Sequence, residues 1–175
     1  MGAVGATNMN QPLGSAPLPA PGPEDHVRGP SKAKLVIVYA DYECPFCAVT
    51  ELRLAECEVQ ICFRHFPIRS KHPRAWAAAQ AAEAAGLQGR FWEMHEALFA
   101  DQGRLEDPHL WARAEALGLD VERFDTERRS PAVISRIKRD FSSGIRGGIA
   151  TTPTVAIDGR LYPGIPSPQL LADAQ

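Results

Sequence analysis

Two cysteines separated by two residues stand out first, in the stretch DYECPFC at residues 41–47. Pro45 suits the first turn of a helix, which places Cys44 at the start of that helix. A helix N-terminus offers unpaired N–H groups and partial positive charge, and both favour a thiolate at Cys44. The spacing brings Cys47 close enough to donate a hydrogen bond to Cys44 and to attack a mixed disulfide. We therefore expect a redox-active pair, with Cys44 as nucleophile and Cys47 as resolving thiol.

Two other interpretations of this pair are a structural zinc site and two inert buried thiols. A structural zinc site commonly uses two close pairs of cysteines, but Cys57 and Cys62 are separated by four residues and Cys62 falls in a predicted strand. Two inert buried thiols are the other alternative, although a helix start behind a strand hides a thiol pair poorly. We expect no metal here. Cys57 is either a free thiol or the partner of Cys62 in a second disulfide, whereas Cys62 alone reads as an inert core thiol.

The elements around the pair are predicted from apolar runs, helical periodicity and turn residues. The first strand, helix and second strand form a βαβ unit, so the two strands should be parallel with a right-handed crossover. A long helical block follows, and Asp158-Gly159 marks a hairpin near the end. In chain order we expect a strand (34–40), a helix (45–56), a strand (59–68), helices (73–147), two strands (154–157 and 160–162) and a helix from Ser167.

This order predicts an α/β protein whose helical block interrupts a sheet domain. Residues 31–71 and 148–175 would form the sheet domain, and residues 72–147 an inserted all-helical domain. Residues 1–30 are rich in proline, glycine and alanine, which is typical of a flexible tail or linker.

Composition narrows the function classes. The chain has 175 residues and a formal charge of −2, so it offers no basic field for nucleic acid. No apolar run approaches the ~20 residues of a membrane-spanning helix. The N-terminus lacks the basic and apolar regions of a signal peptide, so we expect a cytoplasmic protein as the sequence stands. If a leader or anchor has been trimmed, the periplasm or another extracytoplasmic compartment is expected instead.

A second signal is the stretch TTPT at residues 151–154, directly before the third strand. With the motifs DHVRGP, DYECPFC, FRHFPI, FWEMHEALF and TTPTVAIDG, the chain resembles the DsbA-like thiol:disulfide oxidoreductases of the thioredoxin superfamily over about residues 25–164. The resemblance implies a thioredoxin fold with a helical insertion. It also implies that the peptide bond before Pro153 is cis and that this proline lies beside the active-site disulfide. The backbone of Thr152 would pair with an extended substrate. Pro45 and Phe46 would be the active-site dipeptide.

The resemblance implies an enzyme that exchanges disulfides with cysteine-containing proteins or peptides and is returned to its starting state by a redox recycling partner. The Cys44–Cys47 pair would itself carry the two electrons, so neither a metal nor an organic cofactor is expected. The alternative from another class is a non-catalytic, redox-responsive or peptide-binding thioredoxin-like module of a larger protein.

Three features of the sequence depart from the family pattern. Val38 stands where well-known members carry a buried acid, so Asp41 and Glu43 are the candidates for proton transfer, each with the alternative of a purely structural or solvated acid. Phe46 replaces the histidine of the strongest oxidases, so we expect a milder redox potential. The helix after Cys47 is about six residues short.

Four further residues have plainer interpretations. His65 is interpreted as a strand-end histidine with a local hydrogen bond, and His95 as a packing residue. The pair Arg128-Arg129 is interpreted as part of a solvated helix face.

Overall fold

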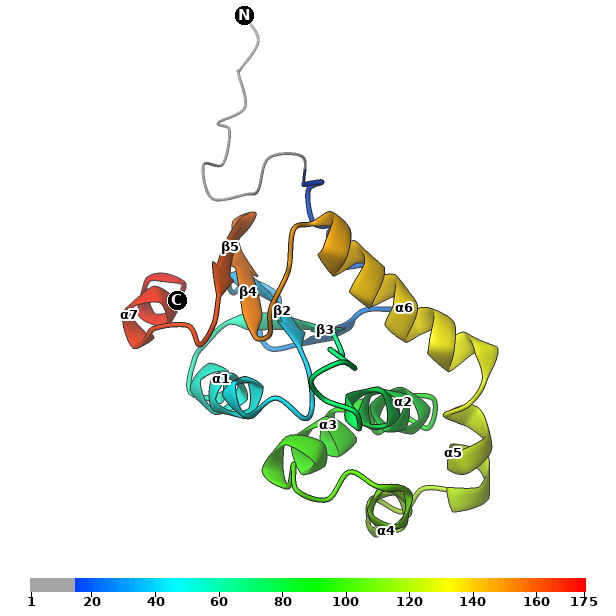
Figure 1. Ribbon diagram of the computed structural model, residues 1–175. Helices are drawn as coiled ribbons and strands as arrows, with labels where there is room; N and C mark the ends of the chain where they lie inside the picture. The colour runs from blue at the N-terminus through cyan, green and yellow to red at the C-terminus, as the bar shows by residue number, and fades with distance from the viewer. Residues whose placement is uncertain (1–14) are drawn as a thin grey trace, which may run out of the picture.

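The computed structural model describes residues 15–175, and these contain one five-stranded mixed sheet in the order β1-β3-β2-β4-β5 (Figure 1). The two central strands β2 and β3 are parallel, as the βαβ pattern predicts, and the other neighbours are antiparallel. The strands are β1 (His26–Arg28), β2 (Leu35–Ala40), β3 (Gln60–His65), β4 (Thr154–Ile157) and β5 (Arg160–Pro163).

Seven helices surround the sheet in this part of the chain, and five of them follow one another between β3 and β4. Proline at the first turn starts α1, α4, α6 and α7, as the sequence indicates. The helices are α1 (Pro45–Ala55), α2 (Ala75–Gly86), α3 (Phe91–Ala100), α4 (Asp107–Ala116), α5 (Val121–Glu127), α6 (Pro131–Arg146) and α7 (Pro168–Asp173).

Strand β2 is buried on both faces because its side chains alternate between two apolar clusters. Val36 and Val38 pack in the larger cluster with residues of α1, α2 and α3, whereas Tyr39 packs in the smaller one with Phe66 and Phe141 of α6. Figure 1 shows α1 and α3 together on one side, with α6 running apart from them along the molecule. Because both faces of the sheet are covered, the loop that follows the carboxyl end of β2 is also partly shielded from solvent.

The predicted linker requires a correction. Strand β1, inside the predicted tail 1–30, pairs antiparallel with β3. Before it, Ala16 N–H donates to the Arg146 carbonyl at 2.8 Å, and the buried guanidinium of Arg64 donates to the Pro19 carbonyl at 2.8 Å. The segment from residue 16 onward is therefore docked on the body of the protein. Residues 1–14 of the predicted tail lie outside the described residues, and the rest of the domain division stays a prediction.

The interpretation of Arg128 as solvated was wrong. Its guanidinium is buried and forms ion pairs with Asp107 at 2.8 Å and Asp125 at 2.9 Å, whereas the neighbouring Arg129 is half exposed. Arg128 thus joins α4 to the end of α5. Two like-charged neighbours on a helix point in different directions, which composition does not reveal.

Candidate active site

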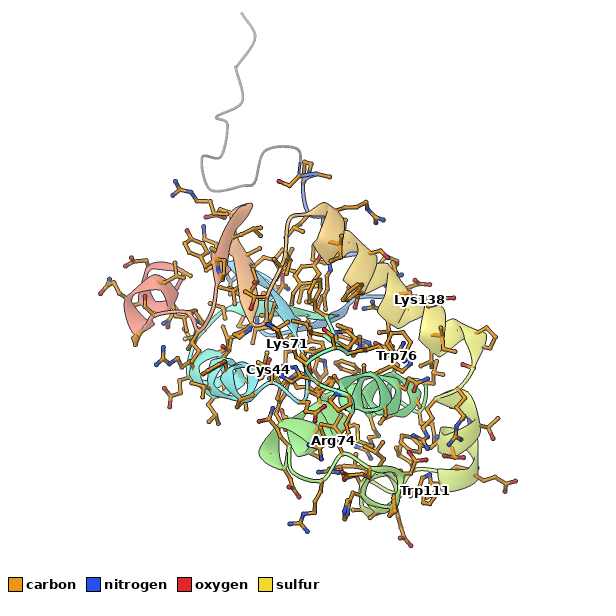
Figure 2. The ribbon with its side chains drawn as sticks, in the orientation of Figure 1. Cys44, Lys71, Arg74, Trp76, Trp111 and Lys138 are labelled. Carbon is orange, nitrogen blue, oxygen red and sulfur yellow. The ribbon has the colours of Figure 1, made fainter. Side chains whose placement is uncertain are left out.

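Cys44 lies where the loop after β2 becomes α1. It is the N-cap residue, with extended backbone angles of φ −78° and ψ 118°, and Pro45 is the first helical residue. Cys47 lies within the first turn and is fully buried, and Cys44 is almost as well covered. All four cysteines are unpaired, so the structure represents the dithiol form. Figure 2 shows Cys44 at the beginning of α1, on the side toward the loop that carries Lys71.

The two thiols have opposite acidities. The pKa of Cys44 is lowered to about 5, first because the Cys47 thiol donates a hydrogen bond to it, which outweighs the burial that opposes ionisation. Smaller contributions come from the backbone N–H groups of Cys47 and Phe46 and from Thr152. Burial, followed by the hydrogen bond to Cys44, raises the pKa of Cys47 well above its ordinary value. At neutral pH the pair therefore consists of a thiolate and a thiol.

Residues from the far end of the sequence complete the site. The peptide bond between Thr152 and Pro153 is cis, as the resemblance implies. The carbonyl oxygen of Thr152 lies 3.5 Å from the sulfur of Cys44, although the two residues are 108 positions apart in the sequence. The structure thus brings together Cys44, Cys47, Thr152 and Pro153, all of them predicted as site residues.

The exposed side of α1 is apolar next to the buried thiols. Phe46 is 59% exposed and Leu52 71% exposed, with Val49 between them on the same helix. The spacing of three residues from Phe46 to Val49 and on to Leu52 places them along one face. The sequence analysis did not identify this stripe, although its periodicity is visible in the sequence. It is a surface on which an apolar peptide side chain could pack beside Cys44.

Asp41 and Glu43 lie in the loop before Cys44, but their contacts differ. The Asp41 carboxylate is buried, accepts hydrogen bonds from the backbone N–H groups of Glu43 and Ile68 at 2.9 Å, and pairs with His72 Nδ1 at 2.8 Å. The Glu43 carboxylate accepts from Arg74 through its backbone N–H at 2.7 Å and its Nε at 2.8 Å. Only Asp41 also contacts the thiol pair, since its backbone N–H points to Cys47 Sγ at 3.4 Å.

One further residue supports the loop. The side-chain amide of Gln102, just after α3, donates to the carbonyls of Tyr42 at 2.8 Å and Cys44 at 2.9 Å. Gln102 was missed in the sequence analysis because nothing in its surrounding sequence indicates contact with residues 58 to 60 positions earlier. It fixes the backbone on either side of the nucleophile.

The other two cysteines do not form a disulfide. Cys62 is fully buried in the smaller apolar cluster, and burial raises its pKa to about 12. Cys57 packs at the edge of the larger cluster, with its thiol donating to the Arg53 carbonyl at 3.2 Å. They therefore lie on different faces of the sheet, which leaves Cys62 the inert core thiol that was expected.

A group of metal-ligand types lies away from the thiols. His26 Nε2 and His65 Nε2 contact the same oxygen of Glu83, at 2.8 and 2.6 Å. Two ligands of one tetrahedral zinc ion would lie about 3.3 Å apart, given zinc–ligand bonds of about 2 Å. The three side chains are therefore arranged as hydrogen-bonding partners that join β1, β3 and α2. The expectation of a local hydrogen bond at His65 was wrong, since its partner lies 18 residues away.

His95 is more than a packing residue. It is buried among aromatic rings, as expected for packing, but its Nδ1 also lies 2.9 Å from the hydroxyl of Tyr42 and its Nε2 3.0 Å from the carboxylate of Glu51. These contacts join α3 to α1 and to the loop before Cys44. His95 therefore braces the site from behind.

The family model of the DsbA-like thioredoxin domain matches residues 69–175, which is more than half of the chain. The chain belongs to the DsbA-like thioredoxin family. Members of this family are disulfide oxidoreductases. The matched range includes the cis-proline loop, whereas the Cys44–Cys47 pair precedes it.

Solved structures of similar fold superpose on most of this chain, including the part before residue 69. A thioredoxin-like oxidoreductase from Silicibacter pomeroyi DSS-3 superposes with a TM-score of 0.78 and 27% identity, covering 87% of this chain and 91% of that one. Pseudomonas aeruginosa DsbA2 gives a TM-score of 0.69 and 28% identity, covering 89% and 94%. The expected α/β thioredoxin fold is confirmed.

Similar curated sequences are much longer than this chain. It is 40% identical over 153 residues to Na(+)/H(+) antiporter NhaA 1 of Salinispora arenicola, and 42% identical over 147 residues to Na(+)/H(+) antiporter NhaA of Herminiimonas arsenicoxydans. These matches cover 84% and 80% of this chain but only 24% and 23% of the relatives. The chain thus spans about a quarter of their length. Within residues 15–175 no helix is long and apolar enough to cross a membrane.

Proposed function

We propose that this DsbA-like chain exchanges disulfides with cysteine-containing proteins or peptides through Cys44 and Cys47. The observation that carries the proposal is the paired acidity at the start of α1. A thiolate at Cys44, with a pKa of about 5, is held beside a protonated Cys47 and next to the Thr152 carbonyl. A low-pKa thiol with a resolving partner one helical turn away is the arrangement that thiol–disulfide exchange requires.

The exchange takes two steps when the dithiol meets a substrate disulfide. The Cys44 thiolate attacks one substrate sulfur, forms a mixed disulfide and releases the other substrate sulfur as a thiolate. Cys47 then loses its proton and attacks Cys44, which forms the Cys44–Cys47 disulfide and frees the second substrate thiolate. Two electrons pass from the dithiol to the substrate, and the reverse sequence oxidises a substrate dithiol. No metal or organic cofactor enters either step of the proposed reaction.

Substrate contacts are proposed at two places beside Cys44. The backbone of Thr152 would pair with an extended peptide, as strand addition does elsewhere. The exposed ring of Phe46 and the apolar stripe behind it would receive a neighbouring side chain of the same peptide. A redox recycling partner would use the same surface, since it must also reach Cys44.

Direction is tested by the redox equilibrium of the Cys44–Cys47 pair against glutathione, read by thiol alkylation and mass. A potential near ~−270 mV would indicate a reductase, and one above ~−180 mV an oxidase or isomerase. The low pKa of Cys44 stabilises the dithiol form by about 2.7 kcal/mol at pH 7, which raises the potential by about 60 mV. If the pair forms no disulfide at any ratio of oxidised to reduced glutathione, the proposal is wrong.

A second candidate function is supported by the long relatives. The matched antiporters carry a segment like this chain within about a quarter of their length, so the chain is a candidate redox-responsive or peptide-binding module of a larger membrane protein. Turnover separates the two functions. An enzyme reduces or oxidises a model peptide disulfide repeatedly and loses this activity in Cys44→Ser, whereas a binding module retains its partner after the same substitution.

We base the proposed compartment on the family rather than on the sequence composition. DsbA-like proteins are typically periplasmic, so an extracytoplasmic location is the better proposal. The expectation of a cytoplasmic location has found no support. Fractionation of cells that express the full protein, with alkylation of Cys44 by a membrane-impermeant reagent, would decide the matter.

A further inference from the structure

Resolution of a mixed disulfide needs a group that removes the proton from Cys47. This thiol is fully buried, and burial raises its pKa far above neutral, so loss of the proton directly to bulk water is unfavourable. Val38, on the strand that leads to the site, is fully buried in the larger apolar cluster, and its side chain has no proton to exchange. Another group must do this work.

Asp41 is the acid of this loop whose backbone contacts the thiol pair. Its backbone N–H lies 3.4 Å from Cys47 Sγ, and its negative charge is among the causes that raise the pKa of Cys47. Its carboxylate is completely buried and forms an ion pair with a histidine. That partner is His72, whose Nδ1 lies 2.8 Å from Asp41 Oδ2.

His72 connects this buried acid to solvent. Its side chain is 21% exposed, whereas that of Asp41 is 0% exposed. It lies in the loop between β3 and α2, and this loop also places the Ile68 N–H on the same Asp41 oxygen at 2.9 Å. An imidazole bonded to a buried carboxylate and open to water on its other side can pass a proton between the two.

The other candidate acid is held differently. Glu43 is fixed by two hydrogen bonds from Arg74, an arginine whose pKa this carboxylate raises, and its backbone N–H donates to the Asp41 carboxylate rather than to a thiol. The titratable and charged groups next to the Asp41–His72 pair thus include the Cys47 thiol, which the Asp41 N–H contacts, and the Glu43 carboxylate with its partner Arg74. Lys71 precedes His72 in the same loop, on the side of the molecule where Figure 2 shows Cys44.

We infer that Asp41 and His72 form the proton-transfer pair of this site. The inference rests on the proposed disulfide exchange and assigns one of its steps. During resolution the Cys47 proton passes to the Asp41–His72 pair and from His72 to water, as the Cys47 sulfur attacks Cys44. In the opposite direction a substrate thiolate attacks Cys44, Cys47 leaves as a thiolate, and the pair returns a proton to it.

The experiment measures the two steps separately in the reduced protein with oxidised glutathione. Acid quenching and mass spectrometry follow the formation of the Cys44–glutathione mixed disulfide and then its disappearance as Cys47 resolves it. The variants are Asp41→Asn, His72→Asn and, as a matched histidine control on α4, His109→Asn. The asparagine at position 72 can still donate a hydrogen bond to Asp41 but cannot take up a proton.

We expect Asp41→Asn and His72→Asn to slow resolution at least tenfold at pH 7, while the first step changes less than about threefold and His109→Asn leaves both steps unchanged. Resolution within twofold of the parent in folded His72→Asn would overturn the inference. A parent protein that forms no mixed disulfide would instead overturn the proposed function.

Glu43→Gln sharpens the result, because it neutralises the other acid of the same loop. We expect resolution to remain within about twofold of the parent. If Glu43→Gln slows resolution as much as Asp41→Asn does, removal of the Cys47 proton does not require the Asp41–His72 pair in particular. The assignment is then wrong. Circular dichroism and urea unfolding of each variant establish which of them are folded before rates are compared.

Discussion

The start of α1 and the middle of β3 each bury a cysteine, and the two thiols have opposite properties. Cys44 is nearly covered yet has a pKa of about 5, whereas Cys62 is completely covered and has a pKa of about 12. The two pKa values differ because only one of the thiols has hydrogen-bond donors beside it. Cys44 receives hydrogen bonds from Cys47 and from backbone N–H groups at a helix start, but Cys62 stands in a strand whose N–H groups already serve the sheet. Burial alone therefore does not make a thiol inert.

The largest expected effect separates the two cysteines by activity. Cys44→Ser should lower the turnover of a model peptide disulfide by about a thousandfold or more, because the attacking atom is lost. Cys62→Ala should leave turnover within about twofold of the parent, since its sulfur is sealed in the smaller apolar cluster. Steady-state assays of both variants, checked for folding, test this. Comparable losses in the two would show that the acidity contrast has no functional meaning.

The next prediction removes the main donor to Cys44. In Cys47→Ala the pKa of Cys44 should rise from about 5 toward the ordinary thiol value of ~8.5, because the hydrogen bond from Cys47 is the first cause of its lowering. Thiolate absorbance near 240 nm, followed against pH, measures the change. A midpoint that remains near 5 would mean that the helix start alone holds the thiolate. Mixed disulfides should also accumulate in this variant.

Acidity at Cys44 should also appear as a pH dependence of stability. Its folded pKa lies below that of the unfolded thiol, so the thiolate stabilises the folded dithiol form fully above ~pH 8.5. This contribution is lost as the pH falls through about 5. The difference in free energy of unfolding between the reduced parent and Cys44→Ala should therefore grow from pH 4 to pH 8.5, as measured with urea. A difference independent of pH would contradict the low pKa.

The smallest effect concerns Cys62 as a packing group. Cys62→Ala removes one buried sulfur and should cost about 1 kcal/mol of unfolding free energy, or a fall in Tm of about 2–4 °C. Thermal unfolding of the reduced protein measures it, with Cys57→Ala as a less buried cysteine for comparison. A larger loss at Cys57 than at Cys62 would contradict the role of Cys62 as the more deeply packed of the two thiols.

Much of the site could be predicted because its chemistry is local. The two-residue spacing of Cys44 and Cys47, the proline between them and the preceding strand together determine a helix start with a thiol at its N-cap. The proline at position 153 was also visible, though its place beside Cys44 came from the resemblance to a family. Signals of this kind depend only on a few neighbouring residues, so the sequence alone is enough to predict them.

What the sequence did not reveal depends on contacts between distant residues. The half-buried segment of β1 is only three residues long, so it shows no clear alternation and was taken for linker. Gln102 and His72 support the loop before Cys44 from other elements, and no spacing in the sequence links them to it. The choice between Asp41 and Glu43 likewise needed the positions of His72 and Arg74, which only the folded chain provides.

The docked segment before β1 also determines how the molecule can be attached to something else. Leu18 lines a depression with Leu35 at the start of β2, whereas Cys44 follows the other end of the same six-residue strand, about 20 Å away. A tether that arrives through the N-terminal segment therefore reaches the end of β2 that lies away from Cys44. Such a domain can be anchored without covering the surface that must meet a substrate.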